Sequence, residues 1–347
     1  MMTFRRKVPT VYAAAIFLMC LLGASSFVLR DDRIRTKLAS STTARMMAST
    51  PTPAPLSSTT SSSKTKGKLL VLGGTGFLGQ TICRRALLEG YKVTSLSRRG
   101  LPPVTNDEKI EQRSNTSKVG SIDFRKGDAR KIDVISSILQ EGGYVGVVHC
   151  IGLLLDDASG LGTYNRFVSG SGSVPDDNSS YDGITRVTAF NAIEATTQFL
   201  QENGEAQGDV RFPFVFTSAA EAGWPDVRGG PQIERLLAPE WLQRYLAAKR
   251  AVEARLLNTD NDAASSSSSS SSLLRPIIVR PSLIYSLDKP ASYAPVGAFF
   301  VGNKLGLPFV DRPVTVQSLA NAIIKSISQE STVEGILRYP EIDSLNQ

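Results

Sequence analysis

The sequence predicts an α/β fold, a doubly wound parallel sheet with helices on both faces and a small C-terminal appendage. Short apolar runs alternate with segments of helical spacing from Lys68 onward, and this alternation is typical of a parallel sheet with right-handed crossovers. A glycine cluster follows directly after the first apolar run. About 280 residues follow the N-terminal region, which is enough for one large domain.

The first 66 residues have the composition of a targeting leader. Arg5-Arg6-Lys7 precede an apolar run from Val11 to Leu22, which ends in small residues and is too short for an ordinary membrane-spanning helix. Residues 33–66 are rich in Ser, Thr, Pro, Arg and Lys and contain no acid, so they cannot bury enough apolar surface to fold. We therefore expect residues 1–66 to be a leader with a disordered segment and residues 67–347 to form the domain.

The order of the two parts of the leader indicates its destination. A secretory signal followed by a transit-like segment resembles the two-part targeting sequence of plastids enclosed by extra membranes, and Ala24-Ser25-Ser26-Phe27 resembles the junction of such leaders. The sequence thus predicts a plastid (chloroplast) protein. A mitochondrial presequence and a retained membrane anchor are the alternatives.

The formal net charge of +7 is concentrated in the leader. Residues 1–66 hold ten Lys and Arg but only two acids, so the domain carries a net charge of about −1. A near-neutral domain lacks the basic surface that binding to a phosphate backbone needs. Nucleic acid is therefore excluded as a partner.

The expected elements follow from local periodicity along the chain. Short runs rich in Val, Ile, Leu and Phe predict strands, and longer segments with apolar residues at helical spacing predict helices. Eight serines at 265–272 interrupt the crossover before the last strand, and we interpret them as a solvated surface insertion. The predicted strands are Lys68–Leu72, Tyr91–Leu96, Ile122–Lys126, Tyr144–Ile151, Pro213–Thr217 and Ile277–Arg280, and the predicted helices are 77–89, 131–140, 184–202 and 239–257.

The glycine cluster lies where the first strand passes into the first helix. Glycine suits a tight turn at positive φ, a close approach of a pyrophosphate to bare backbone, and close packing of the helix on the sheet. In this position the pattern predicts a Rossmann-type dinucleotide site with the phosphates at the helix N-terminus. A glycine-rich turn in an empty scaffold is the alternative. The cluster reads Gly73-Gly74-Thr75-Gly76-Phe77-Leu78-Gly79, in which Gly73, Gly76 and Gly79 are spaced by three.

The residues after the second and third strands bear on the choice of nucleotide. Leu96 is followed by Ser97-Arg98-Arg99 and no acid, whereas a carboxylate at this place would bind the ribose 2′-hydroxyl of NAD. Two guanidinium groups suit a 2′-phosphate, so Arg98 and Arg99 predict NADP rather than NAD. Exposed arginines that contact nothing are the alternative. Asp128 is placed either to meet the adenine amino group or to cap a helix.

Several motifs occur in the order found in the short-chain dehydrogenase/reductase superfamily. They are the glycine turn, Gly127-Asp128, His149-Cys150-Ile151-Gly152, Tyr245-x-x-x-Lys249 and Arg280-Pro281-Ser282-Leu283-Ile284-Tyr285. Within that superfamily the chain resembles the atypical branch of the complex I 39-kDa-type subunit and the coenzyme Q synthesis-associated proteins. The resemblance implies a Rossmann fold, bound NADP(H) or NAD(H) with Gly152 among its contacts, and a location near a quinone-containing membrane.

Tyr245 and Lys249 are the predicted proton-transfer pair. In active members of the superfamily, a Tyr hydroxyl exchanges a proton with the substrate while hydride moves to or from nicotinamide. Lys249 lies one turn after Tyr245 on the same helix face, so its charge would favour the phenolate and its ammonium would bind the nicotinamide ribose. A surface Tyr and Lys on an amphipathic helix are the alternative.

Two positions depart from the pattern of active members. Aligned from Gly223, Ala219 occupies the place of the proton-sharing Ser or Thr, and Ser218 lies one residue early, where strand alternation directs its side chain to the other face. Thr185 occupies the place of an expected Asn. Ser218 is our third predicted catalytic residue in spite of this departure.

His149, the single histidine, lies in an apolar strand and is expected to be a satisfied core residue rather than a catalyst. Together with Cys83 and Cys150 it does not form a metal-ligand spacing, so no metal site is predicted. Residues 282–347 are expected to supply the substrate side. Phe299 and Phe300 would form an apolar lid, a membrane-contacting patch or part of the core.

These expectations lead to two functions. The first is an NADP(H)-dependent oxidoreductase that acts on a small apolar carbonyl or alcohol or on a quinone-like lipid, with peripheral membrane association. The second is a nucleotide-binding accessory or assembly factor of a membrane quinone or electron-transport system, without turnover. Ala219 and Thr185 favour the second function, whereas Tyr245 and Lys249 favour the first.

Overall fold

The computed structural model describes most of the predicted domain. Residues 1–65 of the leader and residues 266–272 of the serine run lie outside the described residues, so the interpretations of both segments stay predictions. The described residues are 66–101, 122–153, 179–203, 211–265, 273–287, 293–305, 310–328 and 331–347.

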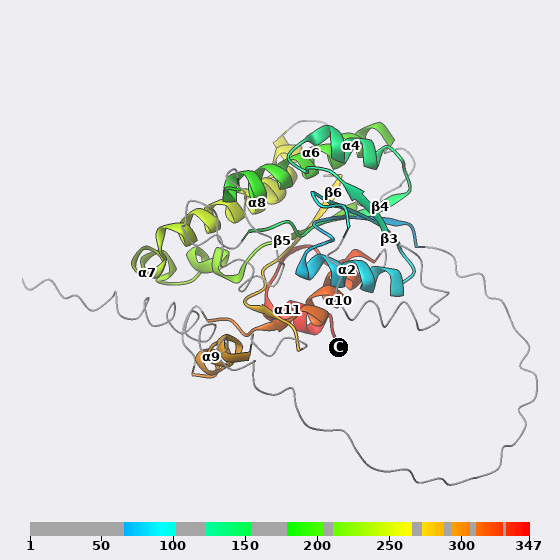
Figure 1. Ribbon diagram of the computed structural model, residues 1–347. Coiled ribbons are helices and arrows are strands. Elements are labelled where there is room, and N and C mark those ends of the chain that lie inside the picture. Colours follow the sequence, from blue (N-terminus) through cyan, green and yellow to red (C-terminus); the bar gives the residue numbers. More distant parts are fainter. Residues whose placement is uncertain are drawn as a thin grey trace, which may run out of the picture.

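One sheet forms the centre of the molecule (Figure 1). It consists of seven parallel strands in the order β3-β2-β1-β4-β5-β6-β9. The chain builds outward from β1 to β3 and then returns to begin β4 on the other side of β1. The carboxyl ends of β1 and β4 therefore border the crevice in which such sheets bind ligands. The strands are β1 (Lys68–Leu72), β2 (Lys92–Ser97), β3 (Ile122–Lys126), β4 (Tyr144–His149), β5 (Phe212–Thr217), β6 (Leu274–Val279) and β9 (Gly335–Leu337).

Helices cover both faces of the sheet, as a doubly wound fold requires (Figure 1). One apolar core lies between the sheet and α2, α10 and α11, and the other lies between the sheet and α4, α6 and α8. The predicted fold class is confirmed, and each predicted strand and helix is present. The helices are α2 (Phe77–Leu88), α4 (Ile132–Leu139), α6 (Thr188–Asn203), α8 (Glu240–Ser265), α10 (Val316–Ile327) and α11 (Tyr339–Ser344), with a π-helical turn η3 (Asp182–Val187) before α6.

The central strand β5 is buried on both faces. Phe212, Phe214 and Phe216 face the core under α6 and α8, whereas Val215 faces the core under α10. This near-continuous apolar run is what a parallel sheet covered by helices on both sides demands.

We expect Phe214→Ala to lower the free energy of unfolding by about 3–5 kcal/mol, because it leaves a cavity at a fully buried site in the middle of the sheet. Urea unfolding followed by circular dichroism measures this loss. Leu88→Ala, at an exposed position of α2, is the control and should change stability by less than about 1 kcal/mol. A loss for Phe214→Ala as small as that of the control would contradict the described core.

The region after β6 divides into two parts, which the sequence did not predict. β9 joins the main sheet beside β6, and α10 packs against α2, so both belong to the main body rather than to an appendage. The remainder is a two-stranded sheet of β7 (Ile284–Tyr285) and β8 (Val314–Thr315), with α9 (Tyr293–Lys304) between the two strands in the chain. In Figure 1, α9 lies apart from the main sheet.

Two further helices precede α8. The 3-10 helix η5 (Ala220–Asp226) follows β5 directly, and α7 (Gly230–Leu237) packs against it. Among the described residues, no helix is both long enough and apolar enough to cross a membrane.

Candidate functional site

The glycine turn forms a cradle at the crevice between β1 and β4. Gly73 has φ of 89°, which favours glycine, and its amide donates to the carbonyl of Leu96 at 2.9 Å. A Cβ on Gly73 would lie 3.1 Å from the backbone of Cys150, the residue after β4. The Cys150 amide in turn donates to Leu72 at 3.0 Å. The turn is thus held tightly against the ends of β1, β2 and β4.

Gly79 lets α2 approach this turn closely. A Cβ on Gly79 would lie 2.2 Å from the Gly73 carbonyl oxygen and 2.7 Å from the Gly74 Cα, so no larger residue fits without moving the backbone. Gly76 caps α2 with no side-chain hydrogen bond, and the first turn of α2 contains no acid. The helix N-terminus therefore faces the crevice with its positive dipole end uncovered by any carboxylate of that turn.

Arg98 and Arg99 are exposed at the end of β2, next to this turn. The Arg99 guanidinium donates to the Thr75 carbonyl at 3.4 Å. Arg99 therefore lies over the glycine turn and does not point away from it. A residue that contacts a phosphate bound at this turn needs such a position.

Asp128 follows β3 and is already engaged by a cation. Arg130 donates to both Asp128 carboxylate oxygens, with the shortest distance at 2.7 Å, and this hydrogen bonding holds the pKa of Asp128 below its usual range. The alternative of a helix N-cap is wrong, because the residue that caps α4 is Lys131. Asp128 instead stabilises the turn before α4 by accepting from the Arg130 amide at 3.0 Å.

Lys249 is buried at the carboxyl ends of β4 and β5, with 3% of its surface exposed. Its Nζ donates to the Thr217 carbonyl at 2.7 Å, and a Cβ on Gly152 would lie 3.7 Å from that Nζ. Burial lowers the pKa of Lys249 to about 8, and the nearby Glu253 carboxylate opposes this shift. The structure therefore brings together two of the predicted cofactor residues, Lys249 and Gly152.

Tyr245 lies on the same face of α8, with Lys249 Nζ 5.7 Å from the centre of its ring. Its ring packs edge-on against Tyr181 at the start of η3, with 5.6 Å between ring centres. Burial raises the pKa of Tyr245, and the charge of Glu221 adds to the rise. The Tyr245 phenol is consequently protonated at neutral pH, which differs from the expectation that Lys249 would favour a phenolate.

Several buried polar atoms near the ends of β4 and β5 lack a partner among the described residues. They include the hydroxyls of Thr185, Thr217 and Ser218. A buried hydroxyl without a hydrogen bond is costly, so these atoms are places where a ligand or water could complete the bonding. Ser218 is buried, and its amide donates to the Val279 carbonyl at 2.7 Å.

His149 is fully buried, and its ring contacts Phe216 at 5.6 Å between centres. The Thr188 hydroxyl donates to Ile184 at 2.7 Å, so its oxygen accepts from Nε2 of His149 at 2.9 Å. Burial lowers the pKa of His149 to about 3. The imidazole is thus neutral, and its Nδ1 is a buried acceptor with no partner in the described ranges.

Glu221 is a titratable group of the site that sequence reasoning missed. It occupies the first turn of η5, and its backbone is held because Arg250 donates to the carbonyls of Glu221 at 3.3 Å and Ala222 at 2.9 Å. Burial raises the pKa of Glu221 to about 7, with a smaller contribution from Asp311. The one available signal in the sequence was an acidic residue shortly after β5. Whether that residue belongs to the site depends on the packing of α8 against η5.

These residues fit a dinucleotide better than they fit a metal ion. The cradle offers bare backbone and a helix N-terminus for phosphates, Arg99 offers a cation beside it, and Lys249 offers an ammonium at the far end. No group of His, Cys, Asp and Glu in the described ranges has the arrangement of a metal site.

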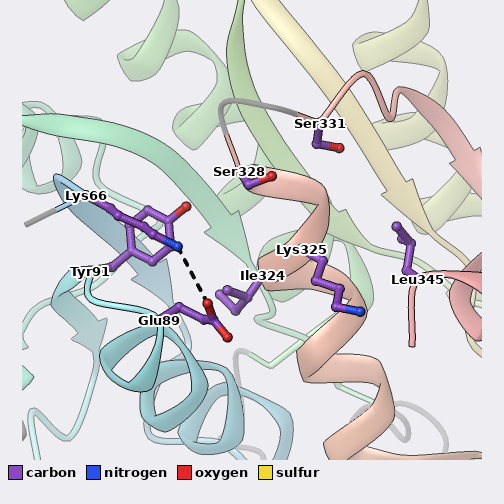
Figure 2. A pocket seen from close by; sticks show the side chains of 8 residues that line it. All are labelled: Lys66, Glu89, Tyr91, Ile324, Lys325, Ser328, Ser331 and Leu345. Carbon is purple, nitrogen blue, oxygen red and sulfur yellow. Dashed lines mark ion pairs between the residues drawn. The ribbon is translucent and has the colours of Figure 1, made fainter. Parts of the chain in front are cut away.

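A separate surface hollow of about 310 Å³ lies at the opposite, amino-terminal edge of the sheet (Figure 2). Figure 2 shows Lys66 paired with Glu89 at 3.6 Å beside Tyr91, across from Ile324 and Leu345. None of its lining residues is among the candidate site residues described above, so it is not part of the candidate site.

Comparison with known proteins agrees with this geometry. Residues 69–165 match the NAD dependent epimerase/dehydratase family. MIOREX complex component 2 of Saccharomyces cerevisiae is 25% identical over 297 residues, which cover 79% of this chain and 98% of the yeast protein.

Two solved structures share the fold. A short-chain type dehydrogenase/reductase from Mycobacterium ulcerans is similar with a TM-score of 0.51 and 16% identity, over 80% of this chain and 90% of that one. A short chain dehydrogenase from Bacillus anthracis is similar with a TM-score of 0.50 and 15% identity, over 79% of this chain and 94% of that one. The two structures bear out the Rossmann fold that the resemblance implies, and the resemblance to the complex I 39-kDa-type branch stays a prediction. The chain has the Rossmann fold of the short-chain dehydrogenases/reductases, and its residues 69–165 carry the sequence pattern of the NAD dependent epimerase/dehydratase family.

Proposed function

We propose that the protein binds a nicotinamide dinucleotide in the crevice between β1 and β4 and catalyses an oxidoreduction there. The observation that carries this proposal is the position of Lys249, whose Nζ lies beside Gly152 while the glycine turn packs against the residue after the same strand, β4. Phosphate cradle and ammonium thus lie along one crevice at the carboxyl edge of the sheet, where such folds bind dinucleotides. The family matched by residues 69–165 is described as NAD dependent, which supports the same cofactor class.

The chain's own residues have distinct roles in this proposal. The bare backbone of Gly73, Gly76 and Gly79 receives the pyrophosphate, and Lys249 holds the hydroxyls of the nicotinamide ribose. When bound, the nicotinamide supplies or accepts the hydride. Tyr245, which retains its proton at neutral pH, donates that proton to the oxygen of a carbonyl substrate. A protonated phenol can act as the general acid in reduction of a carbonyl, so carbonyl reduction is the reaction to test first.

The test combines identification of the nucleotide with turnover. Nucleotide released from the purified protein is identified by mass, and NADPH and NADH oxidation is then measured with a panel of carbonyls and quinones. We expect Tyr245→Phe to lower turnover at least about 100-fold while binding persists, whereas the control Tyr91→Phe, at the opposite edge of the sheet, leaves turnover unchanged. Turnover that survives Tyr245→Phe would overturn the proposed mechanism.

We further propose that NADP is preferred to NAD, because Arg99 lies over the glycine turn and Arg98 is next to it. A charge-assisted bond to a 2′-phosphate contributes about 1.5–3 kcal/mol. We therefore expect Arg98→Ala/Arg99→Ala to weaken NADPH binding at least about 10-fold and to leave NADH binding nearly unchanged. Fluorescence titration of the two reduced nucleotides measures both constants. Equal weakening of NADH and NADPH would contradict this role.

The affinity for NADH should depend on pH through Lys249. The Lys249 ammonium is charged below its pKa of about 8, so ribose binding is intact below that pH and is lost as the pH rises through it. Loss of a hydrogen bond from a charged donor weakens binding by about 10-fold or more. Lys249→Met should show the weaker affinity at every pH, and a pH profile that survives in Lys249→Met would assign the titration to another group.

A second candidate function is nucleotide binding without turnover, in an accessory factor of a larger assembly. Two observations favour it: Ala219 and Thr185 occupy the places where active members carry a proton-sharing Ser or Thr and an Asn, and the yeast relative is named as a component of a complex. A tightly bound nucleotide that is never oxidised or reduced with any carbonyl or quinone would support this function over the first.

We also propose that the leader, residues 1–66, targets the protein to an organelle. A relative in yeast, an organism without plastids, favours the mitochondrial alternative over the plastid. A fluorescent fusion of residues 1–66 tests both destinations in the native cell. The apolar or quinone-like substrate and the peripheral membrane association also stay proposals, which the substrate panel and vesicle sedimentation test.

A further inference from the structure

A series of ion pairs near Lys249 joins four elements, namely the end of β6, α8, η5 and the N-terminus of α11. Arg280 follows β6 and donates to both carboxylate oxygens of Glu253 on α8, at 3.0 and 2.6 Å. Its third nitrogen donates at 2.9 Å to Asp226, the last residue of η5. Arg338, which caps α11, reaches the same Asp226 oxygen at 3.4 Å.

The inner pair of this series is buried, whereas the outer part is open to water. The side chains of Arg280 and Glu253 are each 5% exposed, but those of Asp226 and Arg338 are about half exposed. A buried ion pair is a poor source of stability, because desolvation cancels much of the attraction and an apolar pair of the same size often does as well. The fold alone therefore does not explain why two charges lie here.

The position of Glu253 relative to Lys249 suggests why the Arg280–Glu253 ion pair is buried here. Glu253 is four residues after Lys249 on α8, so both side chains lie on one face of the helix. Lys249 reaches the end of β5 through the Thr217 carbonyl at 2.7 Å, and Arg280 begins directly after β6, the neighbour of β5. Space for Arg280 is left by Gly223, where a Cβ would lie 2.7 Å from its Nη1.

The other groups that face Lys249 carry no charge at neutral pH. His149 on β4 is neutral because burial lowers its pKa to about 3, and the Cys150 thiol is protonated because burial raises its pKa to about 12. The rings of Phe216 and Tyr245 lie 4.9 and 5.7 Å from Nζ, and the Tyr245 phenol is also protonated. Of the groups on these elements that act on Lys249, Glu253 is the one that supplies a negative charge.

We propose that Glu253 and Arg280 are positioning residues for the Lys249 ammonium, Glu253 by keeping it charged and Arg280 by holding Glu253 in place. The proposal rests on the proposed function, since it assigns the pair to nucleotide binding through Lys249. It also gives the C-terminal segment a part in the site, because Arg338 steadies Asp226 and thereby Arg280.

The test is the pH profile of NADH binding, followed by fluorescence from about pH 6 to about pH 10. In Glu253→Gln the pH at which affinity is lost should move down by about one unit or more, because the opposite charge is gone. Affinity should return to the wild-type value at the acidic end of the profile. Glu253→Asp keeps the charge and should keep the wild-type midpoint.

Glu194→Gln is the matched control, since it removes one carboxylate from α6 that pairs with Arg255 of α8 at 3.8 Å, outside the group around Lys249. Its midpoint should equal that of the wild type. If Glu253→Gln does not fold, Glu253→Gln/Arg280→Met removes both buried charges together, and a smaller downward shift is expected because loss of the Arg280 cation offsets part of the loss of the carboxylate.

The outcomes distinguish failure of the positioning role from failure of the proposed function. A folded variant without Glu253 whose midpoint is unchanged, or whose affinity falls equally at every pH, would overturn the positioning role alone. Absence of NADH and NADPH binding by the wild type at any pH would overturn the proposed function and this role with it.

Discussion

Gly79→Ala is expected to abolish high-affinity dinucleotide binding, with a loss of at least about 100-fold, or about 2.7 kcal/mol. The added Cβ would lie 2.2 Å from the Gly73 carbonyl oxygen and 2.8 Å from its carbonyl carbon. Both are backbone atoms of the turn, so the clash is relieved only if α2 moves away from the cradle or the turn distorts. Either movement separates the helix N-terminus from the place of the pyrophosphate. Fluorescence titration with NADH and NADPH measures the loss.

The control for this prediction is another helical glycine. Gly297 lies in α9, and a Cβ there meets nothing within 4 Å, so Gly297→Ala should leave the dissociation constants of both nucleotides unchanged. If Gly79→Ala is folded and binds as tightly as Gly297→Ala, the glycine turn is not the phosphate site and the proposed function fails at its first step.

Arg280→Met is expected to lower the free energy of unfolding by about 3–5 kcal/mol, because it leaves the Glu253 carboxylate buried without its partner. Urea unfolding at pH 7 measures the change. Arg280→Met/Glu253→Gln should recover a large part of the loss, since no unpaired charge then remains in the interior.

An exposed ion pair on the same helix provides the comparison. Arg244 pairs with Glu240 at 2.8 Å, and the Glu240 side chain is 86% exposed, so Arg244→Met should cost less than about 1 kcal/mol. Similar losses for Arg280→Met and Arg244→Met would contradict the expectation that Glu253 is left buried without a partner.

Local sequence determined the framework of this protein. The run from Lys68 to Leu72, the glycines that follow and the apolar spacing of 77–89 are sufficient to predict strand, turn and helix, because each signal depends on neighbours within a few residues. The same reasoning placed Lys249 one turn after Tyr245. It did not find β9, because three residues carry too little periodicity to distinguish a strand from a loop.

The chemical state of the site was decided only by tertiary structure. Burial by distant segments lowers the pKa of Lys249 to about 8 and raises that of Tyr245, and the contact of η5 with α8 brings Glu221 into the site. Spacing along a helix gives the distance between two side chains on that helix. It does not give their exposure to water or the charges, such as Glu221, that other elements bring next to them. Desolvation and charge therefore depend on which strands and helices pack together, and that packing is a property of the whole fold.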